Sequence, residues 1–326
     1  MRRCLKQWVG ALATAVMVAA CGAGDASGDG PTVRIGANLW VGYDLLTVAE
    51  ELDLYGGVDV EIVDFASFSD VVAAFERGHL DGMASTLNEL PQVRARTDLD
   101  PVAVMVTDIS NGADAVLADA SIRSVEELTG ARVAVEPPLG LYVLSRALSS
   151  VGLSLDDVTV VWAQQPEIPI LAEAGQIDAA VSFPPWSVKL VSDHGFASLF
   201  TSADIPGEVV DVVSFRSQFI EDRPEAVRAV LLAWDRAVAH LAEHPYEAIA
   251  RMAAHEGLSE LELRAALEGV ELPTLAQQRD LFTDEILDAT CRRVAEILVG
   301  IDVIEDTLSA VGCVSAEPIL GALGGR

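Results

Sequence analysis

Basic residues are scarce in this 326-residue sequence, which has 21 lysines and arginines against 50 aspartates and glutamates. The formal net charge of −29 at pH 7 repels phosphate backbones and anionic lipid surfaces. We therefore expect neither nucleic acid nor an anionic lipid surface as a partner. Strong acidity is also a common adaptation for solubility, so the charge excludes partners more clearly than it indicates a function.

Histidine and cysteine are also rare, with five and four residues respectively, and they form no cluster with the spacing of metal ligands. We therefore expect no metal site and no cofactor. Cys291 and Cys313 could pair in an oxidising compartment and join the C-terminal helices. Such a loop closure would contribute roughly 3 kcal/mol. Two buried free thiols are the alternative.

The first twenty residues have the pattern of a targeting signal, with three basic residues followed by an apolar run over residues 9–20. Residues 18–21, Val-Ala-Ala-Cys, resemble a bacterial lipobox, which implies cleavage before Cys21 and acylation of its thiol. Removing this signal leaves 18 basic against 50 acidic residues, a net charge of −32. Residues 21–32 are rich in small and polar residues and are typical of a flexible tether. We expect a protein anchored by lipid at the outer face of a bacterial membrane, with an unlipidated secretory signal as the alternative.

A phrase of eight residues occurs twice. Residues 78–85 and 175–182 share Gly, Asp and Ser at the same three positions, Gly78 and Gly175, Asp81 and Asp178, Ser85 and Ser182. Strands that we predict to start at residues 33 and 58 have counterparts starting at residues 133 and 158. An offset held near 97 to 100 residues indicates two similar α/β lobes rather than the general likeness of any two βαβα units.

We therefore predict an α/β protein with two lobes, each built on a mixed five-stranded sheet flanked by helices. The first lobe takes residues 33–111 and 207–326 and includes C-terminal helices, and the second takes residues 112–206. Turn-forming residues near 108–114 and 204–208 mark the two crossings. We expect Ser69 to cap a helix over residues 70–76, and capping boxes at Ser124 and Ser259. Further helices are predicted near residues 224–241, 285–299 and 302–311.

The chain resembles the substrate-binding proteins of bacterial ABC importers with type II periplasmic-binding-protein topology. It is most similar to their nitrate/sulfonate/taurine and thiamine-pyrimidine-precursor group. The resemblance covers roughly residues 33–245 and depends on the order and spacing of four phrases, at residues 40–43, 75–81, 124–136 and 175–181. Phe183-Pro184-Pro185 stands where that group often has Trp-Glu-Pro, so the substrate cannot be transferred directly.

The resemblance implies that the two lobes close on a small polar molecule and that the closed form docks on a membrane permease. We also expect a monomer. Ligands of open α/β sheets bind beyond the carboxyl ends of strands, where aromatic groups can form walls and polar groups can orient the ligand. The candidate ligand-binding residues in these loops are Trp40, Tyr43, Asp44, Ser67, Ser69, Asn88, Glu136, Tyr142, Gln164, Phe183 and Trp186.

None of these loops contains Arg or Lys, whereas Asp44 and Glu136 each add a carboxylate. This favours a ligand that offers N–H donors or positive charge; the alternative is that both carboxylates cap neighbouring backbone N–H groups. An enzyme like the pyrimidine-precursor synthases is a competing function, and Lys189 is the single lysine after the signal that could attach a Schiff-base cofactor. A ligand-sensing module for a signalling partner is a third.

Overall fold

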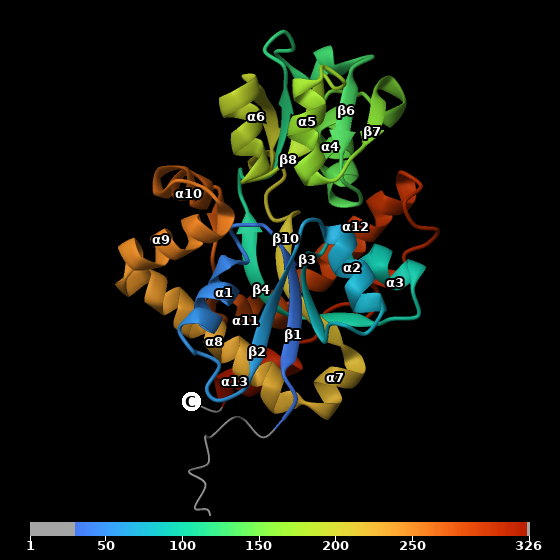
Figure 1. Ribbon diagram of the computed structural model, residues 1–326. Helices are drawn as coiled ribbons and strands as arrows, with labels where there is room; N and C mark the ends of the chain where they lie inside the picture. Colours follow the sequence, from blue (N-terminus) through green and yellow to red (C-terminus); the bar gives the residue numbers. More distant parts are fainter. Residues whose placement is uncertain (1–29, 325–326) are drawn as a thin grey trace, which may run out of the picture.

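The computed structural model describes residues 30–324, whose strands form two separate sheets (Figure 1). The predicted signal peptide, Cys21 and most of the tether lie outside these residues. Within residues 30–324, no helix combines the length and the apolar character needed to cross a membrane.

The first sheet has six strands in the order β11-β4-β10-β3-β1-β2. They are β1 (Val33–Asn38), β2 (Val60–Phe65), β3 (Gly82–Thr86), β4 (Pro101–Ser110), β10 (Val210–Arg216) and β11 (Val270–Glu271). β1 runs parallel to β2 and β3, while β10 is antiparallel to β3 and β4. Our prediction of five strands was wrong for this lobe, because β11 pairs with the far side of β4. Gly269 permits that pairing, since a Cβ there would collide with the backbone of Ala113.

The second sheet has five strands in the order β7-β6-β8-β5-β9, as predicted. They are β5 (Ala115–Ala118), β6 (Arg132–Val135), β7 (Thr159–Trp162), β8 (Ala179–Ser182) and β9 (Ala197–Thr201). β6 is parallel to β7 and β8, and β5 is antiparallel to β8 and β9. The order β7-β6-β8 therefore repeats β2-β1-β3 of the first sheet, followed in each case by antiparallel strands.

The repeated phrase has the same structural role in both lobes. Asp81 and Asp178 each accept the backbone N–H of the residue that begins or nearly begins the neighbouring parallel strand, Arg34 in β1 and Arg132 in β6. Gly78 and Gly175 both have positive φ, 74° and 62°, which glycine adopts without steric cost. The sequence repeat thus specifies how the third parallel strand of each lobe is joined to the first.

Helices flank both sheets (Figure 1). Beside the first sheet lie α1 (Asp44–Glu51), α2 (Phe68–Glu76), α3 (Leu90–Arg96), α7 (Ser217–Asp222), α8 (Pro224–Glu243), α9 (Pro245–Glu256), α10 (Glu260–Leu267), α11 (Leu275–Thr283) and α13 (Glu317–Gly324). The second sheet is flanked by α4 (Leu139–Ser150), α5 (Ile168–Glu173) and α6 (Trp186–His194), and α12 (Ile286–Gly300) lies between the lobes. Short 3₁₀ turns cover Val125–Leu128, Leu155–Asp157, Gln165–Glu167, Ser202–Asp204 and Leu308–Ala310.

Three local predictions are corrected by the structure. Ser67, not Ser69, caps α2, because the helix begins two residues earlier and the Ser67 hydroxyl accepts the N–H of Asp70. Ser124 precedes a 3₁₀ turn without a side-chain cap, whereas the capping box at Ser259 is present. The helix predicted at residues 302–311 is absent: Asp302 has positive φ, and only a 3₁₀ turn forms at Leu308–Ala310.

The C-terminal part of the chain connects the two lobes. Cys291 in α12 and Cys313 are joined by a disulfide. The buried face of α12 joins the hydrophobic core beneath the second sheet, while Val314, next to Cys313, bridges to Ala103 in β4 of the first sheet. α12, which we expected in the first lobe, is thus packed into the core of the second.

The chain passes between the sheets at residues 111–114 and 205–209. The two crossings are held together by Ser202, whose hydroxyl lies 2.8 Å from that of Ser110 and accepts the N–H of Gly112. The carboxyl ends of the parallel strands in both lobes face this region, so the loops after β1, β3, β6 and β8 meet there.

Candidate functional site

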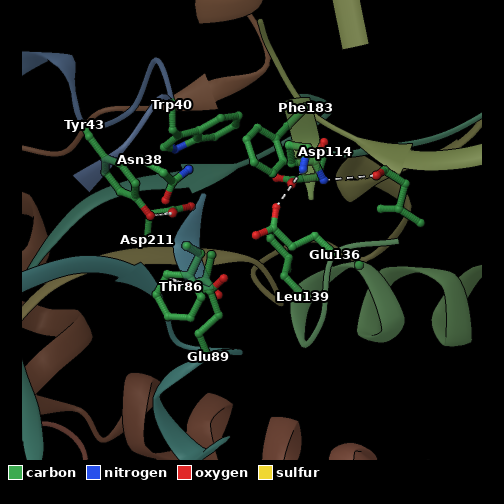
Figure 2. A pocket seen from close by; sticks show the side chains of 14 residues that line it. Asn38, Trp40, Tyr43, Thr86, Glu89, Asp114, Glu136, Leu139, Phe183 and Asp211 are labelled. Carbon is green, nitrogen blue, oxygen red and sulfur yellow. Dashed lines mark hydrogen bonds between the residues drawn. The ribbon is translucent and has the colours of Figure 1, made fainter. Parts of the chain in front are cut away.

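A cavity lies where these strand-end loops meet (Figure 2). The first lobe contributes Asn38, Trp40, Tyr43, Phe68, Thr86, Glu89 and Asp211, and the crossing and second lobe contribute Asp114, Glu136, Leu139, Gly140, Gln165, Val181 and Phe183. Its volume is about 30 Å³, room for little more than one or two water molecules. A larger ligand therefore requires the walls to separate, and the two lobes are the parts that can do so.

Aromatic rings form one side of the cavity. Trp40, in the loop after β1, meets Phe183, after β8, edge to face with ring centroids 5.4 Å apart. This contact joins the two lobes. The indole N–H of Trp40 donates to Asp108 (2.9 Å). Gly42 makes this close approach possible, because a Cβ at that position would overlap both the Asp108 carboxylate and the Trp40 indole nitrogen.

Carboxylates from both lobes and the crossing line other parts of the cavity. Glu89 accepts the N–H of Thr86 at 2.8 Å, and Glu136 accepts the N–H of Gln165 at 3.0 Å. Asp211 accepts the hydroxyl of Tyr43 at 2.5 Å. In Figure 2 Glu136 points to the centre of the cavity from one side, and the pair of Tyr43 and Asp211 stands opposite. No Lys, Arg or His is among the residues lining this cavity.

Burial makes these carboxyl groups weak acids. It raises the pKa of Glu136 to about 7, against the opposing effect of backbone N–H groups at Gln165, Ser69 and Phe68. It also raises the pKa of Asp114 to about 6. The pKa values of Glu89 and Asp211 are raised too, first by burial and then by neighbouring carboxylates. The cavity thus holds a cluster of acidic groups without a basic partner, which burial keeps largely protonated and of which Asp114 and Glu136 ionise as the pH rises through about 6 to 7.

Four of the eleven candidate ligand-binding residues line this cavity: Trp40, Tyr43, Glu136 and Phe183. The other seven, Asp44, Ser67, Ser69, Asn88, Tyr142, Gln164 and Trp186, do not. Ser67 caps α2, Asn88 is fully buried in the turn after β3, and Ser69 lies in a separate surface depression. Gln164 precedes the residue that does line the cavity, Gln165.

Tyr142, Trp186 and Lys189 belong to other parts of the second lobe. The Tyr142 hydroxyl donates to Glu208 (2.7 Å), which also pairs with Arg146. Trp186 lies in α6, where the ammonium of Lys189 stands 4.6 Å from its ring centre. Lys189 is not among the residues that line the cavity.

Asp44 lies behind the Trp40 loop in a different cluster. Its carboxylate bonds to Nδ1 of His255 at 2.7 Å, and Nε2 of His255 lies 3.1 Å from Asp64. Asp44, His255 and Glu256 place one ligand atom each within 4.8 Å of one another, the one such grouping found in residues 30–324. A metal there would have to displace the Asp44–His255 bond. Asp44 does not line the cavity, because α1 turns this carboxylate towards His255 in α9.

The polar cavity residues that the sequence did not point to include Asp211, Glu89, Asp114 and Gln165. Asp211 was missed because β10 is antiparallel, so that its amino end, not its carboxyl end, reaches the cavity. Asp114 lies in the crossing itself, whose turn-forming composition was noted only as a boundary. Glu89 follows β3 and carried the same signal as Asn88, so a strand-end search that weighted charge would have found it.

Comparison with known proteins gives a family and a fold. Residues 27–255 match the model of the NMT1-like family. None of the curated proteins matches the sequence.

Several solved structures are similar over most of their length. The alkanesulfonate-binding protein SsuA from Xanthomonas axonopodis pv. citri, bound to MOPS, has a TM-score of 0.73 at 17% identity, covering 87% of this chain and 98% of that one. The periplasmic nitrate-binding protein NrtA from Synechocystis PCC 6803 has a TM-score of 0.73 at 13% sequence identity, and the match covers 90% of this chain and 88% of that one. The DSZB C27S mutant in complex with biphenyl-2-sulfinic acid has a TM-score of 0.65 at 16% sequence identity, and the match covers 90% of this chain and 99% of that one. At these identities the likeness establishes the two-lobed periplasmic-binding-protein fold.

Proposed function

The chain belongs to the NMT1-like family, and from that premise we propose that it is an extracytoplasmic, lipid-anchored solute-binding protein of an ABC importer. It captures a small polar metabolite between its lobes and delivers it to a membrane permease. The observation that supports this most directly is the cavity lined by residues of both lobes and of the crossing between them. Two similar structures, SsuA and NrtA, are named as binding proteins.

The arrangement suits capture by closure. The Trp40–Phe183 contact bridges the lobes directly over the cavity, while residues 111–114 and 205–209 connect the lobes behind it. Opening at the crossings would separate the two rings and the carboxylates behind them, and a ligand would reunite them by adding contacts to both sides. We propose lobe boundaries at residues 33–111 and 207–326 for the first lobe and 112–206 for the second, with α12 shared.

Closure is tested by small-angle X-ray scattering on the protein lacking its signal. A thermal-shift screen of small metabolites first identifies a stabilising compound, and scattering is then measured with and without it. We expect a smaller radius of gyration with the compound, an unchanged monomer mass and no chemical conversion of the compound. Turnover of the compound, or stabilisation without any compaction, would contradict a role in capture and delivery.

The lipid anchor is tested separately in a bacterium fed with labelled palmitate. The lipobox-like residues 18–21 predict that the full-length chain takes up label and that Cys21→Ala does not. Cys4→Ala is the matched control, because Cys4 precedes the predicted cleavage site and should not alter labelling. Equal labelling of the wild-type and Cys21→Ala chains would show that the thiol of Cys21 is not acylated.

A further inference from the structure

The cavity is lined by four carboxylates, Glu89, Asp114, Glu136 and Asp211, and by no basic side chain. Glu136 and Asp211 are 8% and 2% exposed, and each has one carboxylate oxygen, Oε1 and Oδ2, without a hydrogen-bond partner in the described part of the chain. The hydroxyl of Thr86, also in the cavity wall, lacks a partner as well. Buried polar atoms left in this state cost free energy unless a ligand satisfies them.

These acceptors do not form a metal site. A bare cation requires several ligand atoms around a single point, and within residues 30–324 only Asp44, His255 and Glu256 come that close together. The cavity carboxylates instead stand on different walls, with Glu136 facing Asp211 across the space in Figure 2. Acceptors spaced in this way suit an organic ligand that presents donors in more than one direction.

The aromatic side of the cavity fits the same type of ligand. Trp40 and Phe183 stand over the space between Glu136 and Asp211 in Figure 2, and Phe68 adds a third ring from the first lobe. Aromatic faces attract cations and also cover the apolar parts of a small ligand. A cation placed here would meet carboxylates at the sides and aromatic rings above.

We propose that the ligand is a small organic cation carrying N–H donors, such as an amine, an amidine or a guanidine. This rests on the proposed binding function and specifies the ligand class of that same site. Glu136 and Asp211 accept its N–H groups from the two lobes, so that the charged group itself draws the lobes together. Charge-assisted hydrogen bonds of this kind are about twice as strong as neutral ones.

An inorganic anion or a sulfonate is disfavoured by the same geometry. It would have to approach four acidic groups in a site from which water is largely excluded, and no cation in the lining would offset the repulsion from those that ionise. The net charge of −29 adds a long-range field that concentrates cations at the protein and repels anions. In this respect the site differs from what is named for SsuA and NrtA, an alkanesulfonate and nitrate.

Proton linkage gives the proposal a pH signature. Because the pKa of Glu136 is about 7 and that of Asp114 about 6, raising the pH through this range ionises the cavity and should tighten the binding of a cation. The bound cation in turn favours the ionised carboxylates, so binding near pH 6.5 should release protons. Titration in two buffers of different ionisation enthalpy measures that release.

Isothermal titration calorimetry at low salt tests the ligand class with defined probes. Agmatine and putrescine supply guanidine and amine groups, 1,4-butanediol is the neutral analogue, choline is a cation without N–H donors, and taurine and nitrate carry the relatives' anionic chemistry. We expect agmatine or putrescine to bind, more tightly at pH 8 than at pH 6, and the other four to bind at least tenfold more weakly or not at all.

Variants separate a ligand contact from a structural role. Glu136→Gln and Asp211→Asn should each weaken binding of the cationic probe at least tenfold, about 1.4 kcal/mol. The ligand-free variants should keep or increase their melting temperature, because each substitution replaces a buried acid that no basic side chain neutralises by an uncharged amide of similar shape. Glu173→Gln is the matched control, since Glu173 is an exposed glutamate at the end of α5, away from the cavity, and it should leave both quantities unchanged.

Other outcomes overturn the proposal in distinguishable ways. If nitrate or taurine binds and neutralising Glu136 tightens it, the ligand class is wrong while the binding function stands. The same holds if a neutral metabolite compacts the protein and no amine or guanidine binds. Choline bound as tightly as agmatine would remove the role of N–H donors. If no small molecule either stabilises or compacts the protein, the proposed function itself fails.

Discussion

The two lobes share a strand order but differ at the end that faces the cavity. In each lobe a central strand, β1 or β6, has a parallel neighbour on both sides, and antiparallel strands continue the sheet beyond one of these neighbours, β3 or β8. The strand orders are β2-β1-β3-β10-β4 in the first lobe and β7-β6-β8-β5-β9 in the second. At the end away from the cavity, Asp81 and Asp178 make equivalent bonds. At the cavity end, β1 leads to Trp40 and Tyr43, whereas β6 leads directly to Glu136. The repeated features therefore maintain the fold, and the features that differ define the site.

The lobes also differ in how they neutralise buried acids outside the cavity. Glu208, in the crossing where it contacts α4 of the second lobe, has a permanent cation: burial opposes ionisation, but hydrogen bonds from Arg146 and Tyr142 lower the pKa of Glu208. In the first lobe the partner of Asp44 is a histidine, His255, and bonds to Asp44 and then Asp64 raise the pKa of His255 to about 10. The positive charge of His255 can thus be lost at high pH, whereas the positive charge of Arg146 beside Glu208 cannot.

Removing His255 should have the largest effect on stability among the changes that test this difference between the lobes. His255→Ala leaves the buried Asp44 without its cationic partner and should lower the free energy of unfolding by about 3 kcal/mol near pH 6. Because the folded pKa of about 10 lies above the unfolded value of about 6.5, this stabilisation is fully present below pH 6.5 and is lost as pH rises towards 10. Urea unfolding at several pH values measures the difference between wild type and variant.

His79→Ala is the matched control, because His79 is an exposed histidine three residues after the end of α2. It should change stability by less than about 0.5 kcal/mol. A gap between wild type and His255→Ala that stays constant or widens from pH 6.5 to 10 would show that His255 is not charged in the folded protein.

The sequence predicted the features that are repeated in both lobes better than the features that differ between them. The repeat at residues 78–85 and 175–182 predicted two lobes because its Gly and Asp positions have local backbone roles that recur wherever the same turn recurs. β11 was missed because two residues are too short to show an alternating pattern, and its pairing depends on the distant β4.

The site was predicted only in part, for reasons of geometry. Trp40, Glu136 and Phe183 directly follow or closely follow parallel strands, so the strand-end rule found them. Asp211 enters from the amino end of an antiparallel strand, and Asp44 is held by His255, 211 residues away in the sequence. No local pattern reports either fact. Of the two carboxylates expected in the cleft, Glu136 lines the cavity, together with Glu89, Asp114 and Asp211, and Asp44 does not.

The smallest expected effect on stability concerns the two repeated aspartates, Asp81 and Asp178. Asp178 accepts the backbone N–H of Arg132 and also binds its guanidinium, with 2.7 Å between Oδ1 and Nη2. Asp81 accepts only the backbone N–H of Arg34, whose guanidinium pairs with Glu61 instead. Both sites are partly exposed, so the added ion pair contributes at most about 1 kcal/mol. We therefore expect Asp81→Ala to cost about 1 kcal/mol and Asp178→Ala slightly more.

Acid pH should remove the excess cost of Asp178→Ala. Hydrogen bonds from Arg132 lower the pKa of Asp178, so its extra contribution is present above the unfolded value of about 3.9 and is lost as pH falls through the lowered folded pKa. Urea unfolding of both variants at pH 7 and pH 3 makes the comparison, with Asp178→Asn retaining an acceptor for the backbone N–H of Arg132. If Asp178→Asn is as unstable as Asp178→Ala at pH 7, the ion pair with Arg132 stabilises the fold and the backbone hydrogen bond shared with Asp81 does not. The segments 78–85 and 175–182 would then be alike in sequence but not in their contribution to stability.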